Sequence, residues 1–442
     1  MSAYGYRRDT TPFLRALATE SIVFDHAASQ WPKTVPAFAS IMTGKFGHSN
    51  GVMRFTTGQA LDDSHEALAE MMAAAGYDTA AFVSTSALNE KTNVLQGFKT
   101  AVETFLDANP FGNATKTALG WLARRREKPF FAWVHYNNAH YPYNGGGGPP
   151  DMYVDDEYYD ASRPVKCNMD VPMKIPAANL ANLGSRPLDM EVVRRNIGGI
   201  QPAAVLEGRP YELDYYVARY DAGIHAADAQ IGRLIRTARK QGLLGNTIIA
   251  VVGDHGEAFG EHNYYVEHGR FPYDDCVLVP MMIRPVGDLV PARVKVPVPA
   301  FAVAPTLLEM VGIRPPQAME AKSLLGLMRG GPGPRFVYTE SGYMPDYTIS
   351  VREQNWKLIH IPNSLDRYFM NDTEYELYDL SNDPGELKNL VAQQSDVAAR
   401  LRQTLTEWSK PWVADAYSGP MRIDLKLDTE TIGRLRALGY VE

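Results

Sequence analysis

Apolar positions along the chain follow two spacings, one typical of buried strands and the other of helices. Residues 129–136 and 246–252 are nearly continuous apolar runs, as expected of strands buried on both faces. Residues 68–75 and 211–241 instead carry apolar side chains at helical spacing, and Gly242 follows the longer segment, a common place for glycine after a helix. This alternation of strands and helices predicts an α/β fold.

The remaining apolar segments extend the pattern along the chain. Residues 9–24 begin with a Thr-Pro start signal and predict a helix that runs into a short strand. Residues 79–84 and 279–284 predict two more strands, and residues 304–311 predict a further helix. Over residues 141–210 regular spacing is lost among glycines, prolines and an acidic, tyrosine-rich patch, which predicts a long surface excursion.

The pattern changes after the glycine-rich linker at residues 330–333. Short strands are predicted at residues 336–340, 349–352 and 356–361. A helix is predicted over residues 397–408. We therefore expect one large α/β domain over residues 1–330, and a smaller C-terminal α+β subdomain with short antiparallel strands and a helix over residues 331–442.

The composition is that of a globular protein, with 45% apolar and 21% charged residues among 442. A net charge of -7 provides no basic surface, so we expect no nucleic-acid partner. No apolar run approaches the roughly 20 residues of a membrane-spanning helix, and the first residues lack a secretory signal, so we expect a soluble, cytoplasmic protein. With only Cys167 and Cys276, a disulfide framework is excluded, and Cys276 lies in an apolar run typical of a core.

Metal-ligating side chains cluster directly after the strand predicted at residues 246–252. Residues 253–257, Gly-Asp-His-Gly-Glu, begin at its carboxyl end, where α/β folds bind ligands, and His262 and His268 follow in an expected loop. Asp and His both ligate divalent cations, and the two glycines let the backbone approach closely. An isolated Asp-His-Gly run also fits a solvated turn, but the additional histidines favour a hydrolytic metal site.

A further set of motifs is spread over the whole chain. It comprises Tyr4-Gly5-Tyr6 with Thr10-Thr11-Pro12, Ser40-Ile41-Met42-Thr43-Gly44 with His48, residues 130–143, residues 220–234, Ala304-Pro305-Thr306-Leu307-Leu308 and residues 376–386. Together these motifs resemble the sulfatase family of the alkaline phosphatase superfamily. The resemblance implies a mixed, mostly parallel central sheet sandwiched by helices, as in alkaline phosphatase, and a catalytic domain that hydrolyses ester bonds.

The resemblance also implies roles for single residues. Asp254 and His255 would bind a divalent metal ion, and His140 and His268 would orient the ester or protonate its leaving group. His262 is a weaker candidate for contact with the substrate, and it also fits a role in satisfying loop backbone. The family default is Ca²⁺, whereas an Asp-His pair suits Mn²⁺ or Zn²⁺, so the identity of the metal stays open among the three.

The position of the nucleophile departs from the family pattern. Sulfatases place Cys or Ser before x-Pro-x-Arg and oxidise it to formylglycine, but the matching residues here are Thr34-Val35-Pro36-Ala37-Phe38. Threonine cannot yield that aldehyde and Phe38 cannot supply a guanidinium, so we do not expect formylglycine chemistry. Thr34 resembles the threonine nucleophile of phosphoryl-transferring relatives. A helix N-cap ahead of Pro36 is the structural alternative.

The start of the sequence is a second departure from the family. A first strand ending in acidic metal ligands precedes the family segment that Tyr4-Gly5-Tyr6 matches, whereas this sequence begins at Met1. We expect a truncated start rather than a redesigned site. Loss of a central strand would leave backbone groups of its neighbours unpaired, and loss of its carboxylates would leave a divalent cation under-neutralised.

Three functions are compatible with these residues. The leading hypothesis is a metal-dependent hydrolase of small-molecule sulfate or phosphate mono- or diesters, with Thr34 or a metal-bound water as nucleophile; the threonine favours phosphate or phosphonate esters. The alternatives are a non-catalytic relative that keeps the fold for binding, and a phosphotransferase that passes a phosphoryl group from Thr34 to an alcohol. Residues that determine substrate specificity are expected in residues 141–210 and in the C-terminal subdomain. Candidates without an assigned role are the tyrosines of that stretch and Arg163, Arg194, Arg195 and Arg209.

Overall fold

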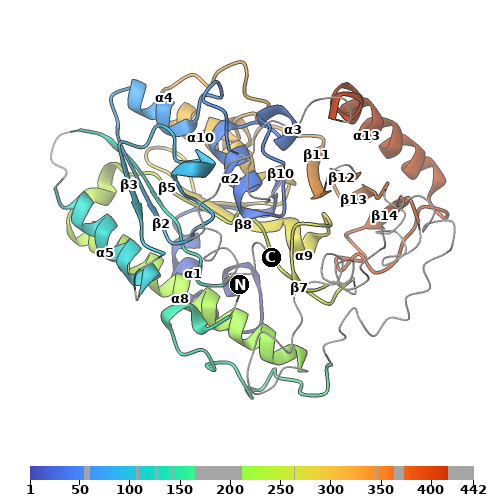
Figure 1. Cartoon of the computed structure of the whole chain (residues 1–442), viewed down its shortest axis with the longest axis horizontal. Helices are drawn as coiled ribbons and strands as arrows, with labels where there is room; N and C mark the ends of the chain where they lie inside the picture. Colours follow the sequence, from blue (N-terminus) through green and yellow to red (C-terminus); the bar gives the residue numbers. More distant parts are fainter. Residues whose placement is uncertain are drawn as a thin grey trace, which may run out of the picture.

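The computed structural model describes residues 1–53, 60–105, 107, 109–124, 128–141, 143–164, 212–262, 264–343, 346–362 and 373–416. In these residues, β-strands lie between two layers of helices. Helix α5 (Pro110–Leu122) lies at one end of the molecule, and a separate four-stranded sheet with helix α13 (Ser395–Ala416) lies at the other (Figure 1). Cys167, Arg194, Arg195 and Arg209 fall outside the described residues.

One part of the central layer is a parallel sheet of three strands. Its order is β3 (Thr100–Glu103), β2 (Asp78–Val83), β4 (Phe130–Val134). Ala80 and Phe82 of β2 pack against α5, and the alternate residues of β2 face the main core on the other side, because successive side chains of a strand point to opposite faces. The run at residues 129–136 therefore forms a strand, as predicted.

The other part of the central layer is a mixed sheet. Its order is β10 (Val298–Pro299), β1 (Ile22–Ala28), β8 (Leu278–Arg284), β5 (Ile249–Val252), and β9 (Ala292–Val294) also pairs with β1. Strand β1 runs parallel to β9 and β10 and antiparallel to β8, which is in turn antiparallel to β5. Taken with the three-stranded sheet, four pairings of the central layer are parallel and two are antiparallel, which agrees with the predicted mixed, mostly parallel arrangement.

Helices cover both faces of the central layer. On one face, α2 (Thr34–Thr43), α4 (Leu68–Ala74) and α10 (Val303–Met310) contribute to the largest buried apolar cluster. On the other face, α1 (Pro12–Ala18) and α8 (Leu213–Lys240) pack through Leu14, Leu17 and Ile235 against Val23 and Met282. Residues predicted at helical spacing thus place their apolar side chains on the sheet.

A carboxylate from α8 fixes the amino end of α1. Asp228 accepts hydrogen bonds from the backbone N–H groups of Phe13 and Leu14, each at 2.8 Å. These amides have no partner within α1 itself, and a negative charge is favourable at a helix amino terminus. The N-cap residue Thr11 makes no side-chain capping bond, so Asp228 supplies the cap from a distant part of the chain.

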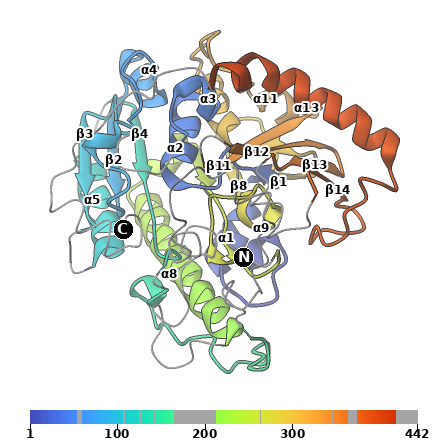
Figure 2. The same ribbon diagram turned by 45° about the vertical axis from the view of Figure 1, so that its right-hand side comes forward.

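The C-terminal region forms an antiparallel sheet in the order β11 (Val337–Tyr343), β12 (Asp346–Glu353), β13 (Trp356–His360), β14 (Tyr375–Asp379). Figure 2 shows α13 lying across this sheet, where Leu401 and Leu405 join its buried cluster. The expected antiparallel strands and helix are therefore present. A domain boundary at residue 330 stays a prediction.

The remaining elements are short. They are η1 (Ser2–Tyr4), α3 (Gly47–Asn50), η2 (Glu90–Thr92), η3 (Gly145–Gly147), η5 (Leu243–Asn246), β6 (Ala258–Phe259), β7 (Tyr265–Glu267), α9 (Asp274–Val277), η6 (Ala300–Ala302) and α11 (Leu325–Met328). Cys276 is a buried free thiol, as expected. Arg163 pairs with Asp214 at the start of α8. In the described part of the chain, no helix has the length and apolar character needed to span a bilayer.

The two central sheets do not join. Among the described residues, β4 pairs only with β2, and β5 pairs only with β8. A cavity of 1570 Å³, here called the interstrand slot, is lined by both of these strands. Every residue of β4 and of β5 is partly exposed, whereas β2 is almost wholly buried.

Candidate active site

Thr34 and His255 are brought together from distant parts of the sequence. Thr34 is the first residue of α2, and His255 follows β5 by three residues. The Thr34 Oγ1 atom lies 3.1 Å from His255 Nε2, which is hydrogen-bonding distance. The N-cap alternative for Thr34 is wrong: Lys33 occupies that position, and no side-chain cap is formed. The Thr34 hydroxyl therefore points towards the strand ends.

The tautomer of His255 is fixed by its second ring nitrogen. His255 Nδ1 lies 2.8 Å from the carbonyl oxygen of Gly256, which can only accept, so Nδ1 carries the proton. The lone pair of His255 is then on Nε2, where it can accept a hydrogen bond from the Thr34 hydroxyl. The same Nε2 atom lies 3.5 Å from Asp254 Oδ2.

Asp254 is favoured in its ionised form. Burial acts to raise the pKa of Asp254, but His255 and His135, when protonated, and backbone hydrogen bonds outweigh it, so the pKa lies below its ordinary value. A carboxylate, an imidazole nitrogen and a hydroxyl oxygen therefore lie together at the carboxyl end of β5.

His268 and His140 complete this group of side chains. The rings of His255 and His268 stack with centroids 4.1 Å apart, and the ring of His140 meets that of His268 edge-on at 5.7 Å. His268 Nδ1 lies 3.0 Å from Glu257 Oε1, and its buried Nε2 has no hydrogen-bond partner among the described residues. Burial lowers the pKa of His268 well below its ordinary value, which favours a neutral imidazole, and burial raises the pKa of Glu257 above its ordinary value.

His262 lies elsewhere, although it is close in sequence. Its ring stacks on Tyr273 with centroids 3.6 Å apart and an interplanar angle of 6°. Its charged neighbours are Lys357, Asp383 and Asp274, which are not part of the group around Thr34. The structure therefore does not bring His262 to the other candidate residues.

Two residues at the site were not among the sequence candidates. Lys33 precedes Thr34, lies 3.7 Å from Glu267, and its charge acts on His140 and His268. Glu257 holds the His268 ring. Lys33 was detectable from its place next to the nucleophile position, and Glu257 from its place in the Gly-Asp-His-Gly-Glu run.

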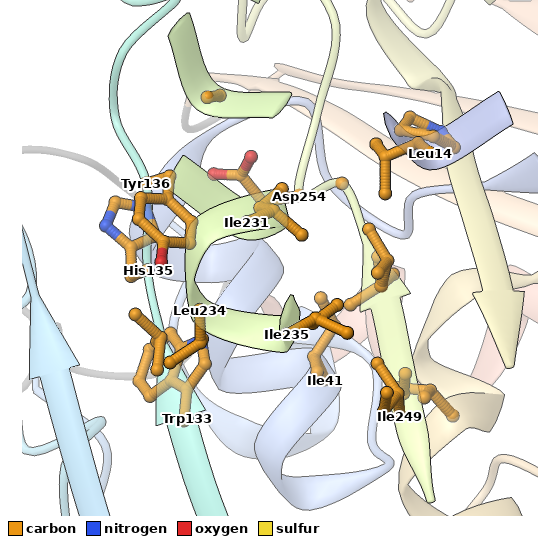
Figure 3. A pocket seen from close by; sticks show the side chains of 18 of the residues that line it. Leu14, Ile41, Trp133, His135, Tyr136, Ile231, Leu234, Ile235, Ile249 and Asp254 are labelled. Carbon is orange, nitrogen blue, oxygen red and sulfur yellow. The ribbon is translucent and has the colours of Figure 1, made fainter. Parts of the chain in front are cut away.

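Phe38 and His135 form the apolar wall behind the site. The Phe38 ring packs against Trp133 at 4.8 Å and against His135 at 5.3 Å, and Phe38 is buried. Burial lowers the pKa of His135 to about 4, which keeps its ring neutral. Figure 3 shows His135 and Asp254 at the same end of the interstrand slot. Phe38 and His135 therefore pack against each other as buried side chains.

The donors near Asp254 fit a small, open cation site. Two ligands of one divalent cation, each roughly 2.0–2.6 Å from it, are separated by about 3 Å when they lie side by side. The separations of 3.1 and 3.5 Å around His255 Nε2 match this geometry. Within the described ranges no group of three or more His, Cys, Asp or Glu side chains converges, and the further oxygen beside His255 Nε2 is the Thr34 hydroxyl. Substrate or water would fill the remaining positions.

Comparison with known proteins identifies the family. The model of the family described as Sulfatase matches residues 1–313, well over half of the chain. The chain belongs to the sulfatase family. A second model, described as the C-terminal part of N-sulphoglucosamine sulphohydrolase, matches residues 260–411. The family assignment made from the motifs is thereby confirmed, and enzymes of the sulfatase family use divalent metal ions.

Relatives of this sulfatase-family chain cover most of its length. An N-acetylglucosamine-6-O-sulfatase of Bacteroides thetaiotaomicron is 24% identical, over 93% of this chain and 84% of the relative. An arylsulfatase of Clostridium perfringens is also 24% identical, over 86% of this chain and 85% of the relative. These values fit membership of one family with distant sequences.

Solved structures share the fold. A protein bound to its substrate D-glucosamine-2-N,6-O-disulfate is 22% identical, with a TM-score of 0.67 over 93% of this chain and 95% of that one. The phosphonate monoester hydrolase of Agrobacterium radiobacter is 18% identical, with a TM-score of 0.66 over 92% of each chain. The alkaline-phosphatase-like fold class is thus confirmed.

Proposed function

We propose that this sulfatase-family protein hydrolyses a small-molecule phosphate or sulfate ester, with the Thr34 hydroxyl as nucleophile. The observation that carries the proposal is the 3.1 Å contact between Thr34 Oγ1 and His255 Nε2, which pairs a nucleophile with a proton acceptor. The backbone carbonyl of Gly256 holds the acceptor in the required tautomer. This arrangement of nucleophile, base and orienting group is typical of hydroxyl activation.

The proposed reaction begins with the Thr34 proton. His255 Nε2 accepts this proton as Thr34 Oγ1 forms a bond to phosphorus or sulfur, and the bond from that atom to the ester oxygen breaks. The departing oxygen takes a proton from His140 or His268 on the opposite side and leaves as an alcohol. Water then attacks the Thr34 adduct, which releases phosphate or sulfate and restores the hydroxyl.

Asp254 and His255 are the proposed residues for holding the divalent cation, with Thr34 as the third donor. When bound, the cation would lower the pKa of the Thr34 hydroxyl and polarise the ester. His255 Nε2 has a single lone pair, so His255 would serve either as the acceptor of the Thr34 proton or as a ligand of the cation, and not as both at once. Removing His255 would abolish both routes. Ca²⁺, Mn²⁺ and Zn²⁺ are the candidate cations.

His140 and His268 are the proposed contacts for the leaving-group side of the ester. Both rings lie next to His255, and the His268 Nε2 atom is buried without a partner among the described residues. An anionic ester bound there would satisfy that nitrogen and draw a proton onto it, because a nearby negative charge favours the protonated imidazole. The ammonium group of Lys33 would stabilise the same negative charge.

The nature of the nucleophile favours phosphate or phosphonate esters over sulfate esters. Thr34 cannot be converted to formylglycine, and Phe38 is a buried packing residue that places no cation beside the nucleophile. Similarity in fold to a phosphonate monoester hydrolase supports this choice, and similarity to sugar sulfatases supports a sulfated sugar as the alternative substrate.

A non-catalytic binding function is the second candidate. It is favoured by the lack, within the described residues, of three converging His, Cys, Asp or Glu side chains. A pseudoenzyme would bind an anionic ester at His140, His268 and Lys33 without turning it over. Binding and turnover separate the two candidates.

The test measures hydrolysis of three substrates, p-nitrophenyl phosphate, p-nitrophenyl phenylphosphonate and p-nitrophenyl sulfate. Each is assayed with Ca²⁺, Mn²⁺ or Zn²⁺ supplied. Thr34→Val keeps the shape of the side chain and removes the hydroxyl, so we expect at least about a 10³-fold loss of kcat/KM. Thr34→Ser should keep measurable activity. Thr43→Val, which removes another buried hydroxyl of α2, is the matched control and should keep full activity.

Three results would redirect the proposal. Equal activity of wild type and Thr34→Val would exclude Thr34 as the nucleophile. Saturable binding of a phosphate ester without turnover under any metal would establish the binding function. Formation of a new ester when glycerol is added, at the expense of free phosphate, would identify a phosphotransferase.

A further inference from the structure

A short irregular segment leads directly to the proposed nucleophile. Residues 29–33 separate the end of β1 from Thr34, the first residue of α2. Ser29, Gln30 and Trp31 of this segment are each only 2% exposed. A buried segment without regular structure must find partners for its backbone in other parts of the chain. The contacts of these three residues therefore decide where Thr34 lies.

Strand β11 of the C-terminal sheet supplies such partners. It pairs with β12 along one edge, and Figure 1 shows it on the side of that sheet that faces the central layer. On its other, outer edge, the Glu340 N–H donates to the Gln30 carbonyl at 2.9 Å, and the Thr339 hydroxyl donates to the Ser29 carbonyl at 3.0 Å. The outer edge of β11 thus holds the segment that leads to Thr34.

The same edge of β11 holds the segment that carries His268. The Gly342 N–H donates to the carbonyl of Gly269 at 3.0 Å. Glu340 and Gly342 are alternate residues of one strand, so their N–H groups point to the same side and lie roughly 7 Å apart. The carbonyls of Gln30 and Gly269 are therefore held side by side on a single strand.

The two segments held by β11 also touch each other next to the site. The stem of Lys33 lies over Gly269, where a Cβ atom would be 2.7 Å from Lys33 Cδ. Gly269 has a φ of +102°, a conformation that suits glycine and few other residues. Lys33 precedes Thr34, and Gly269 follows His268. The spacing along β11 therefore bears directly on the separation of the nucleophile from the leaving-group side of the proposed site.

Trp31 anchors the segment in the core of the C-terminal sheet. Its side chain belongs to the buried apolar cluster of that sheet, and the Tyr347 ring meets it edge-on at 6.0 Å. Gly47 packs against the Trp31 ring from the large domain, since a Cβ atom there would be 3.1 Å from Trp31 Cε3. A displacement of Trp31 would therefore move the backbone three positions before Thr34.

We propose that the outer edge of β11 positions the active site, with Trp31 and Thr339 as positioning residues for the Thr34 hydroxyl. Neither side chain touches the reacting atoms, and both act through the backbone of residues 29–33. The inference rests on the proposed function, because it assigns these residues a part in the same reaction. A displacement of a reacting group by about 1 Å can lower turnover roughly a hundredfold, so kcat should respond more than KM.

The first experiment compares two buried threonines of the same sheet. Thr339→Val keeps the shape of the side chain and removes the hydroxyl that bonds to Ser29. Thr348→Val removes a hydroxyl that has no hydrogen-bond partner among the described residues. We expect kcat for a p-nitrophenyl ester to fall about tenfold in Thr339→Val, with KM within about twofold, and to stay unchanged in Thr348→Val. Thr339→Ser keeps a hydroxyl and should restore kcat.

A second pair of variants separates positioning from packing. Leu401 of α13 is fully buried in the same apolar cluster as Trp31. Trp31→Leu and Leu401→Ala both remove buried apolar volume, so both should lower the urea midpoint. Only Trp31→Leu should also lower kcat, by about 10²-fold. If Trp31→Leu fails to fold, the threonine pair decides the question.

Hydrogen exchange supplies a readout that needs no turnover. The Ala37 N–H donates to the Lys33 carbonyl at 2.9 Å in the first turn of α2, and the Gly44 N–H donates to the Ser40 carbonyl at 2.8 Å at its other end. In Thr339→Val the Ala37 amide should exchange at least about tenfold faster, because the segment before it is less firmly held. The Gly44 amide should not change.

Several outcomes would overturn the proposal. Equal kcat values for Thr339→Val and Thr348→Val would exclude a positioning role for Thr339. Equal losses of kcat in Trp31→Leu and Leu401→Ala would reduce Trp31 to a packing residue. Absence of turnover by the wild type under every metal would reject the proposed function, whereas unchanged exchange of the Ala37 amide in Thr339→Val would reject the hold by β11 independently of turnover.

Discussion

The His262 side chain makes stability depend on pH in a way that can be calculated from its surroundings. His262 is 9% exposed and stacks on the ring of Tyr273. Burial, followed by the positive charge of Lys357, lowers its pKa from 6.5 to about 4, against the opposing effect of Asp383 and Asp274. The folded protein therefore holds a neutral imidazole over a range of pH in which the unfolded chain is protonated.

The sign and size of the effect follow from proton linkage. Between pH 6.5 and about 4 the unfolded state binds more protons than the folded state, so stability falls as pH falls. Above pH 6.5 neither state binds the proton and the penalty vanishes. From pH 7 to pH 5 this one residue removes about 2 kcal/mol from the free energy of unfolding, because each pH step of one unit is worth about 1.4 kcal/mol.

The assay is urea unfolding of wild type and His262→Phe at pH 7 and pH 5. Phenylalanine keeps an aromatic ring against Tyr273 and cannot be protonated. We expect the loss of stability between the two pH values to be about 2 kcal/mol smaller in His262→Phe than in wild type, with the urea m-value unchanged. Other titrating groups cancel in this double difference. An identical pH dependence in the two proteins would refute the reasoning.

Three further changes test other parts of the fold. Lys357→Met removes the cation that lies 2.7 Å from Asp274 and 2.7 Å from Glu386, and should cost about 3–5 kcal/mol in chemical unfolding; a cost below 1 kcal/mol would contradict a buried ion cluster. Asp228→Ala removes the cap of α1 and should cost about 1–2 kcal/mol, whereas an unchanged urea midpoint would show that water replaces it. Gly97→Ala places a Cβ against the backbone nitrogen of Glu70 at a φ of +84° and should lower the free energy of unfolding by roughly 1–3 kcal/mol; an unchanged urea midpoint would contradict this.

Much of the fold could be predicted from the sequence because its apolar runs are long. The runs that became β4 and β5 are nearly continuous, and residues 211–241 carry a helical stripe over many turns. The placement of Asp254 and His255 followed from the strand before them, since residues after a strand of an α/β sheet lie at its ligand-binding edge.

Contacts between distant segments could not be predicted. His262 is only seven positions from His255, but it lies between β6 and β7, and its ring stacks on Tyr273. Thr34 also fitted an N-cap signal, and only the fold showed that its hydroxyl lies within hydrogen-bonding distance of His255. The roles of Lys33 and Glu257 likewise depend on which segments pack against them.

The interstrand slot illustrates a different limit. The apolar pattern predicts that β4 and β5 are strands buried on both faces, and it says nothing about which strand lies beside which. The partial exposure of both strands became visible only when the order of the two sheets was known.

The most direct test of the account is to look for a covalent adduct on Thr34. The protein is mixed with an activated phosphate ester in the presence of divalent metal, quenched in acid within the first turnover, and digested for mass spectrometry. The account predicts one phosphoryl group on Thr34 in wild type and none in Thr34→Val. Turnover by wild type without an adduct, together with undiminished turnover by Thr34→Val, would contradict the central claim that this hydroxyl is the nucleophile.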